Sequence, residues 1–279
     1  MTLKKKIILA VVAIPLAFLV FVTVRRLNAT LYDLPDPAFL ADMGAVNTLN
    51  DDNKIFKTGN LFIYRLRITD SVGHDQQLYL RNSLSGPEPA LAPVNKEHDN
   101  PPYAIDHVTL EVFRNKGETG LGETQTIIKY DYKNGDRKVL FGEKTGVVED
   151  STRVFLHPPR SHFFYMNELT PFPYVRFPIA ENTSWEMPFG IPDHAMKQYD
   201  YLTDTMLQLS YSLIERETIP TPWGIDSVYK FKAFAKNSEI NTSCEYYFSE
   251  RYGFVRIEFH NLHGVTIRMD LDDIKQVSQ

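Results

Sequence analysis

The sequence SCEYYF at residues 243–248 is followed by GFVRIEF at residues 253–259 and by VTIRMDL at residues 265–271. In each run the apolar residues occur at every second position, which is the period of a β-strand with one buried face. Only short polar segments separate the runs, and Gly253 and the segment Asn261–Gly264 are typical of turns. Strands joined by short turns, without a helix between them, predict an antiparallel β-meander.

The same alternation recurs upstream. Asn134 and Gly135 lie between two such runs, and this dipeptide predicts a hairpin because both residues tolerate positive φ. The further predicted strands are residues 62–68, 108–112, 128–132, 139–141, 207–213 and 229–235. We therefore predict a mainly β fold with one large antiparallel meander, whose curved sheet is a half-barrel or closes into a barrel. Either closure or another layer has to cover one face, and the pattern leaves both open.

An apolar run near the N-terminus predicts a membrane segment. Residues Ile7–Val24 are 18 uncharged, mostly apolar residues between Lys4–Lys6 and the pair Arg25–Arg26. A helix of this length spans roughly 27 Å, close to the hydrocarbon thickness of a bilayer. The run is longer than the apolar part of most signal peptides, and two arginines follow it where a cleavage site would start. We therefore predict an uncleaved signal anchor with a cytoplasmic N-terminus, because the lysines outnumber the arginines.

This anchor divides the chain into three predicted regions. Residues 1–26 are the cytoplasmic tip and the transmembrane signal anchor, residues 27–59 are a connector, and residues 60–279 are an extracytoplasmic antiparallel β domain. Asp36 and Pro37 in the connector suit the N-cap and the first position of a short helix. The extracytoplasmic space is the periplasm if the organism is bacterial.

The net charge of −5 hides an asymmetry. Residues 1–26 carry five basic side chains and no acidic one, so the rest of the chain has a net charge of −10. A field of this sign repels phosphate backbones and anionic headgroups, which argues against nucleic-acid binding and against peripheral contact with an acidic bilayer. A content of 43% apolar and 13% aromatic residues indicates a compact fold rather than a disordered tail.

Two proline-rich stretches interrupt the alternation. Residues 82–104 have few large apolar side chains, so we predict a mobile loop there, and a lid is one interpretation of it. Residues 157–193 are also rich in proline, but they carry aromatic side chains that can bury a large apolar area. This second stretch is therefore predicted to be a crossover that packs against the sheet.

The chain lacks the signatures of common enzyme classes, such as a nucleophile elbow, a zinc-protease helix, a phosphate loop or a dinucleotide fingerprint. His260 and His263 flank a turn without a third ligand at a recognisable spacing, so a hairpin explains them better than a metal site. Cys244 is the only cysteine and alternates in phase with aromatic residues, which indicates a buried thiol. We predict no catalytic residue, no metal and no cofactor.

One constellation suggests a binding site. The sequence HPPRSH at residues 157–162 precedes a run of aromatic residues, and an arginine beside aromatic rings can stack on a ligand. The predicted ligand-binding residues are Arg160, His162, Phe163, Tyr165, Phe172, Tyr174 and Trp185. The pair Asp193–His194 belongs to the same stretch, and its titratable groups leave open a hydrolase that would use His157, His162 and Glu168. Turn-capping histidines and core-filling aromatics explain the same residues without any site.

The C-terminal residues resemble a known family. The run ETIPTPWGID at residues 217–226 and the run YYFSERYGFV at residues 246–255 are similar to the ending of a family of uncharacterised exported bacterial β-meander domains. These domains in turn resemble the half-barrel of the lipoprotein-localisation factors. The resemblance implies an open curved sheet with an apolar concave face, and it supplies no catalytic residues. Trp223 stands where the family usually has a small residue in the turn.

Together these patterns predict a membrane-anchored extracytoplasmic domain that binds a ligand or acts as an accessory protein through an apolar, aromatic cleft. Its predicted partners are the membrane, through residues 7–24, and an apolar ligand or an envelope protein, but no nucleic acid. A structural or assembly role in an envelope complex and the hydrolase are the two alternatives.

Overall fold

The computed structural model describes residues 53–83, 86–94, 104–113 and 125–277. These residues all belong to one compact unit, Pro35–Gln279. The predicted membrane segment at residues 7–24 and the helix predicted to start at Asp36 lie outside the described residues. Within the described ranges, no helix has the length and apolar character needed to cross a membrane.

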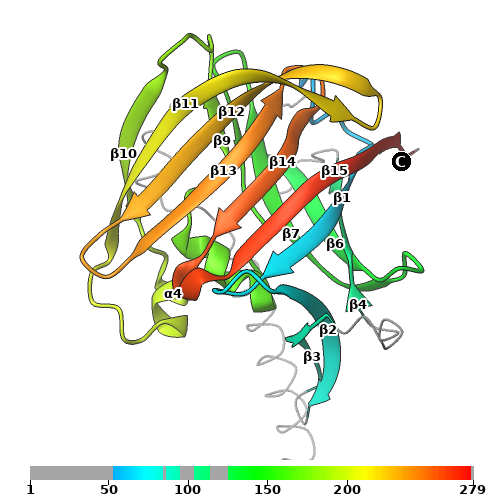
Figure 1. Cartoon of the computed structure of the whole chain (residues 1–279), viewed down its shortest axis with the longest axis vertical. Helices are drawn as coiled ribbons and strands as arrows, with labels where there is room; N and C mark the ends of the chain where they lie inside the picture. The colour runs from blue at the N-terminus through cyan, green and yellow to red at the C-terminus, as the bar shows by residue number, and fades with distance from the viewer. Residues whose placement is uncertain (1–52, 84–85, 95–103, 114–124, 278–279) are drawn as a thin grey trace, which may run out of the picture. The chain divides into compact units, whose positions relative to one another are not determined.

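Fifteen strands of the described residues form a single sheet (Figure 1). The strands are β1 (Asn60–Thr69), β2 (Asp75–Ser83), β3 (Gly86–Pro93), β4 (Ala104–Ile105), β5 (His107–Val112), β6 (Thr126–Lys133), β7 (Val139–Glu149), β8 (Arg153–Leu156), β9 (Tyr174–Arg176), β10 (Ser184–Gly190), β11 (Met206–Thr221), β12 (Gly224–Lys236), β13 (Asn241–Ser249), β14 (Gly253–His260) and β15 (Thr266–Gln276). Three short helical segments join them, namely η1 (His162–Leu169), α4 (Asp193–Gln198) and η2 (Leu262–Gly264).

The order of strands in space follows the order in the chain over most of the sheet. It runs from β10 to β15, continues with β1, and then runs from β5 to β9. Neighbouring strands are antiparallel, for example β13 with β14 and β14 with β15. This arrangement confirms the predicted antiparallel meander. The order ends at β9 and at β10, which do not pair with each other, so hydrogen bonds do not close the sheet.

The interior of the sheet is filled by the chain itself. Residues 157–173 lie between the two halves of the sheet, because residues of β6 and of β13 both bond to them. The Tyr130 hydroxyl of β6 donates to the His157 carbonyl at 2.8 Å, and the Thr242 hydroxyl of β13 donates to the Leu169 carbonyl. The ring of Phe172 packs in the same core at 4% exposure. The prediction that the 157–193 crossover packs against the sheet is confirmed for residues 157–173, whereas β9 and β10 within that stretch are strands of the sheet itself.

The prediction of a loop over residues 82–104 is wrong for the described part of that stretch. Residues 86–93 form β3, which pairs with β2 and with no other described strand. Pro87, Pro89 and Pro93 all occupy odd positions, and alternate residues of a strand direct their N–H groups to the same side. The N–H groups that these prolines lack would all point away from β2. No hydrogen bond to β2 is therefore lost, and an edge strand tolerates the three prolines.

A carboxylate holds the N-terminal end of the described domain. The side chain of Glu149, at the end of β7, accepts hydrogen bonds from the backbone N–H groups of Lys54 and Ile55 at 2.8 and 2.9 Å through Oε1. Its Oε2 accepts from the N–H of Phe56 at 2.8 Å. Phe56 itself is fully buried, so this clamp fixes an apolar anchor in the core.

Candidate functional site

The structure brings only part of the predicted ligand-binding set together, since the rings of Tyr174 and Trp185 lie 5.4 Å apart. Arg160, Phe172 and Tyr174 are buried, Phe163, Tyr165 and Trp185 are half-buried, and His162 is exposed. The rings of Phe172 and Tyr174 pack at 5.8 and 5.6 Å from the ring of Phe155, inside the core. None of the seven residues lines the pocket beside Arg65, the pocket beside Glu149 or the pocket beside Gln76. Ligand binding by this set stays a prediction.

Arg160 belongs to a buried polar cluster at the start of the crossover. Its Nη1 donates to Oε1 of Glu168 at 3.3 Å, and the two side chains are 6% and 1% exposed. The carboxylate of Glu143 accepts from the Tyr132 hydroxyl and from the N–H of Arg160, the latter at 3.1 Å. Burial raises the pKa of Glu143, against the opposing effect of these hydrogen bonds. The cluster fastens the crossover to β6 and β7.

The hydrolase alternative gains no support from this geometry. His157 is 1% exposed, and neither of its ring nitrogens has a hydrogen-bond partner among the described residues. Burial, with the charge of Arg160, lowers its pKa well below 6.5, so its ring is neutral near pH 7. General acid-base catalysis needs an oriented partner that His157 does not have here. Asp193 lies exposed at the start of α4.

Neither metal binding nor thiol chemistry is favoured by the described side chains. No group of three or more His, Cys, Asp or Glu among them is placed to hold a metal ion. Cys244 is fully buried, as its alternation predicted, and burial raises its pKa well above 9.0. A buried thiol with a raised pKa is inert.

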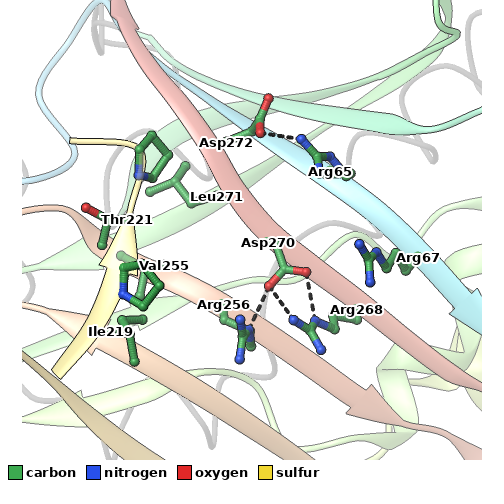
Figure 2. Close-up of a pocket in the computed structure, with 12 residues that line it drawn as sticks. Arg65, Arg67, Ile219, Thr221, Val255, Arg256, Arg268, Asp270, Leu271 and Asp272 are labelled. Carbon is green, nitrogen blue, oxygen red and sulfur yellow. Dashed lines mark hydrogen bonds and ion pairs between the residues drawn. The ribbon is translucent and has the colours of Figure 1, made fainter. Parts of the chain in front are cut away.

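A different group of residues forms a polar hollow on the outer face of the sheet (Figure 2). Its volume is about 250 Å³. Four guanidinium groups line it, from Arg65 and Arg67 of β1, Arg256 of β14 and Arg268 of β15. We call this site the arginine hollow. Its remaining wall is formed by Asp270 and Asp272 of β15, by the end of β11 at residues 219–222, and by the apolar side chains of Val255 and Leu271.

Strand register brings the four arginines together. Alternation along β1 buries Leu66 and leaves Arg65 and Arg67 on the outer face. Arg67 lies directly opposite Arg268, and Asp270 lies opposite both Arg65 on β1 and Arg256 on β14. Like charges directly opposite each other in an antiparallel pair destabilise a sheet. Repulsion between Arg67 and Arg268 therefore destabilises the folded state locally. An anion bound between the two guanidinium groups would reduce this repulsion.

The aspartates neutralise only part of this positive charge. Asp270 accepts from Nε of Arg256 at 2.6 Å and from Nε of Arg268 at 2.7 Å, while Asp272 accepts from Arg65 at 2.7 Å. Burial by itself raises the pKa of Asp270, but the hydrogen bonds from Arg268 and Arg256 outweigh it and lower the pKa. Arg67 is exposed and has no ion-pair or hydrogen-bond partner among the described residues. The four guanidinium groups and two carboxylates that line the hollow have a net charge of +2, and Glu258 lies just outside this lining, with its Oε2 4.0 Å from Nη1 of Arg268.

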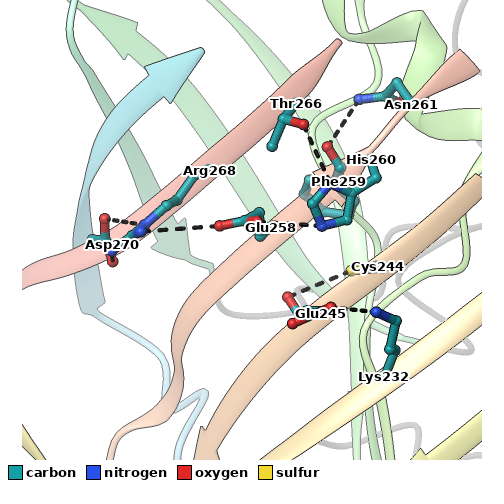
Figure 3. A network of polar contacts seen from close by, with 10 residues as sticks. All are labelled: Lys232, Cys244, Glu245, Glu258, Phe259, His260, Asn261, Thr266, Arg268 and Asp270. Atoms are coloured by element: carbon teal, nitrogen blue, oxygen red, sulfur yellow. Dashed lines mark hydrogen bonds and ion pairs between the residues drawn. The ribbon is translucent and has the colours of Figure 1, made fainter. Parts of the chain in front are cut away.

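Neighbouring basic side chains along the same face lie beside carboxylates (Figure 3). Lys232 of β12 lies 2.6 Å from Glu245 of β13, and His260 lies 3.2 Å from Glu258 of β14. Exposed pairs of this kind contribute little to stability. Glu258 also lies 4.0 Å from Arg268, so this network reaches the arginine hollow, where Arg67 is the one lining arginine without an ion pair among the described residues.

The sequence contained part of the signal for this site. Arg65 and Arg67 alternate with buried residues in the same way as Arg256 and Arg268 do, and such a pattern predicts an outward-facing pair. The alternation within each strand does not show that the arginines of β1 and those of β14 and β15 become neighbours. β1 and β15 lie at opposite ends of the described chain, and only their pairing brings these residues together.

No protein-family model matches the sequence. No curated protein matches it either.

Among solved structures, the chain is similar to a candidate lipoprotein from Parabacteroides distasonis, with 13% identity over 81% of this chain and 100% of that chain and a TM-score of 0.39. It is similar to a candidate exported protein with a YmcC-like fold from Bacteroides fragilis, with 11% identity over 79% and 97% of the two chains and a TM-score of 0.38. The hypothetical lipoprotein YmcC from Escherichia coli matches with 11% identity over 81% and 92%, and a TM-score of 0.31. Similarities of this size carry no argument about function.

Proposed function

We propose that this chain is a membrane-anchored, extracytoplasmic, non-catalytic binding domain whose arginine hollow takes an anionic group. The membrane attachment is the one predicted for residues 7–24. The observation that carries the proposal is the net charge of +2 in a hollow that contains an unpartnered arginine, Arg67. The aromatic cleft predicted for the crossover has no role in it, because the interior of the sheet is occupied by residues 157–173.

The chemistry of the hollow favours a carboxylate or a phosphate. A guanidinium group is a planar fork of donors that matches both anions, and such bonds are stronger than neutral ones. Arg65 uses one terminal nitrogen on Asp272, and Arg67 uses none, so donors on both side chains of β1 face the hollow without an acceptor. A bound anion would also separate the charges of Arg67 and Arg268.

The full chain is purified in a neutral detergent. Inorganic phosphate is titrated into it at low ionic strength, and calorimetry measures the heat of binding. We expect saturable binding that weakens as salt is added, because exposed charges are screened. The substitution Arg67→Gln removes one charge-assisted bond of about 1.5 kcal/mol and should weaken binding about tenfold.

Lys232→Gln is the matched control, since Lys232 lies on the same face but outside the hollow and is already paired with Glu245. Its phosphate affinity should equal that of the parent chain. Equal affinities for the parent chain and for Arg67→Gln, or the absence of any saturable heat, would refute the proposed site.

A further inference from the structure

An exposed apolar tip lies beside the arginine hollow. β11 and β12 form a long hairpin whose turn contains Pro222, Trp223 and Gly224, and Gly224 adopts a φ of 116° that favours glycine. Trp223 is 39% exposed and Ile225 is 81% exposed. Thr221 and Pro222, the residues just before Trp223, line the hollow itself. The apolar tip and the cationic hollow are therefore one continuous surface.

The aromatic residues of this surface are held in place. The ring of Trp223 stacks on Tyr252 of the β13–β14 turn, with ring centroids 4.5 Å apart and planes 25° apart. The guanidinium of Arg251 lies 4.9 Å from the same tyrosine ring. The exposed ring of Trp223 is fixed by this stacking and cannot fold away from water, so its exposure favours an apolar partner.

We propose that this surface docks on a lipid bilayer, with the phosphate of an anionic phospholipid in the arginine hollow and Trp223 and Ile225 in the interfacial layer. The proposal rests on the anion site of the proposed function and names the molecule that supplies the anion. We call the docking element, Pro222–Ile225 with Tyr252 and Arg251, the hairpin tip.

The composition of the hairpin tip matches the chemistry of the bilayer interface. Tryptophan and tyrosine concentrate at the level of the headgroups, because each has an apolar body and a polar edge. Arginine keeps its charge in the headgroup layer while its aliphatic part covers apolar surface. A free phosphate ion would satisfy the arginines but would leave Ile225 and Trp223 in water. A bilayer satisfies both parts of the surface at once.

The net charge of −10 predicted for the part of the chain after residue 26 does not describe this surface. The hollow carries +2, and Arg251 adds a further positive charge at the tip. Asp226 accepts from the Ser249 hydroxyl at 2.6 Å and Glu250 accepts from the Tyr229 hydroxyl at 3.1 Å, and both carboxylates keep their negative charge because these donors are neutral. With Arg251 and these two carboxylates included, the residues that line the hollow still sum to +1, so the positive charge lies in the hollow rather than at the tip. Residues 25–52, if fully extended, could reach up to about 90 Å, so the tip can reach the bilayer that holds the anchor.

The test uses the full chain with Trp185→Phe, which leaves Trp223 as the only tryptophan. The protein is reconstituted into vesicles of phosphatidylcholine, with or without phosphatidylglycerol, that carry a spin label at a shallow acyl position. We expect the label to quench Trp223 more strongly when phosphatidylglycerol is present. Each arginine near an anionic surface contributes a factor of about five in binding, so Arg65→Gln with Arg67→Gln should reduce the docked fraction severalfold.

Two controls keep the test decisive. Lys232→Gln, outside the hollow, should leave the quenching unchanged, and Ile225→Ser should weaken it in both lipid mixtures. If Trp185→Phe does not fold, the same signal is obtained as the difference between the native chain and Trp223→Phe.

The proposal is overturned if Trp223 is not quenched, or if its quenching is the same without phosphatidylglycerol. It is also overturned if Trp223 is shielded from a water-soluble quencher but not reached by the lipid label, which would indicate a protein partner at the tip. Phosphate binding in detergent without quenching in vesicles would refute only the docking, and loss of both would refute the anion site as well.

Discussion

The clamp made by Glu149 predicts how firmly the N-terminal end of the domain is attached. One carboxylate, 8% exposed, accepts from three successive backbone N–H groups, those of Lys54, Ile55 and Phe56. Glu149→Gln keeps the shape of the side chain but replaces one acceptor oxygen by an NH₂ group and removes the charge. At least one buried N–H group then faces a donor.

The magnitude follows from the bonds that are lost. Hydrogen bonds to a charged group contribute about 1.5–3 kcal/mol each, and a buried donor left without a partner costs about 1–3 kcal/mol. Because the glutamine oxygen can still accept from two N–H groups, we expect a total loss of about 2–4 kcal/mol in the free energy of unfolding. This is a large part of the roughly 5–15 kcal/mol that a folded domain has.

Two measurements on the full chain in detergent check the prediction. Urea denaturation followed by tryptophan fluorescence gives the change in unfolding free energy. Hydrogen exchange of the amides of residues 54–56 reports local opening, which should accelerate by roughly 30-fold to 1,000-fold if the clamp opens without global unfolding. Glu245→Gln is the matched control, because its half-buried, solvent-accessible pair with Lys232 is expected to contribute no more than about 1 kcal/mol. A Glu149→Gln chain with native unfolding energy and native exchange at these amides would refute the reasoning.

Three further predictions concern the core. Stability should fall as the pH is lowered below about 6.5, because the unfolded chain then protonates His157 while the buried ring, with its lowered pKa, stays neutral. His157→Leu should reduce the change of unfolding free energy with pH by up to about 1.4 kcal/mol per pH unit. Unfolding free energies from urea denaturation at pH 5 and pH 7 give this change, and the same difference in both chains would contradict the prediction. Gly253→Ala should lower the melting temperature, since φ is 76° there and a Cβ would lie 2.7 Å from Cγ2 of Ile55, whereas Gly73→Ala, with a positive φ but no such neighbour, should cost less. Phe172→Ala should lower the unfolding free energy by about 3–5 kcal/mol through the cavity it leaves, and a loss below about 1 kcal/mol in urea denaturation would show that this ring does not fill the core.

Hydrophobic periodicity was sufficient for the central strands. The alternation in residues 243–271 predicted β13, β14 and β15 and their short connections, and it also predicted that Cys244 is buried. It failed for β3, because prolines are unfavourable in a strand unless they lie on its unpaired side. The sequence does not show which side of β3 is unpaired. It also missed β9, because Tyr174–Arg176 is too short to show any period.

The sequence by itself determined the mainly β character, the antiparallel meander and the packing of an aromatic crossover, because these follow from which side chains avoid water along a local stretch of chain. The arginine hollow could not be derived in this way. Arg67 and Arg268 are separated by most of the domain in sequence, and only the pairing of β1 with β15 makes them neighbours. Net charge predicted a surface that repels anions, whereas strand register placed four arginines around one hollow, because the register of distant strands decides which charges share a face.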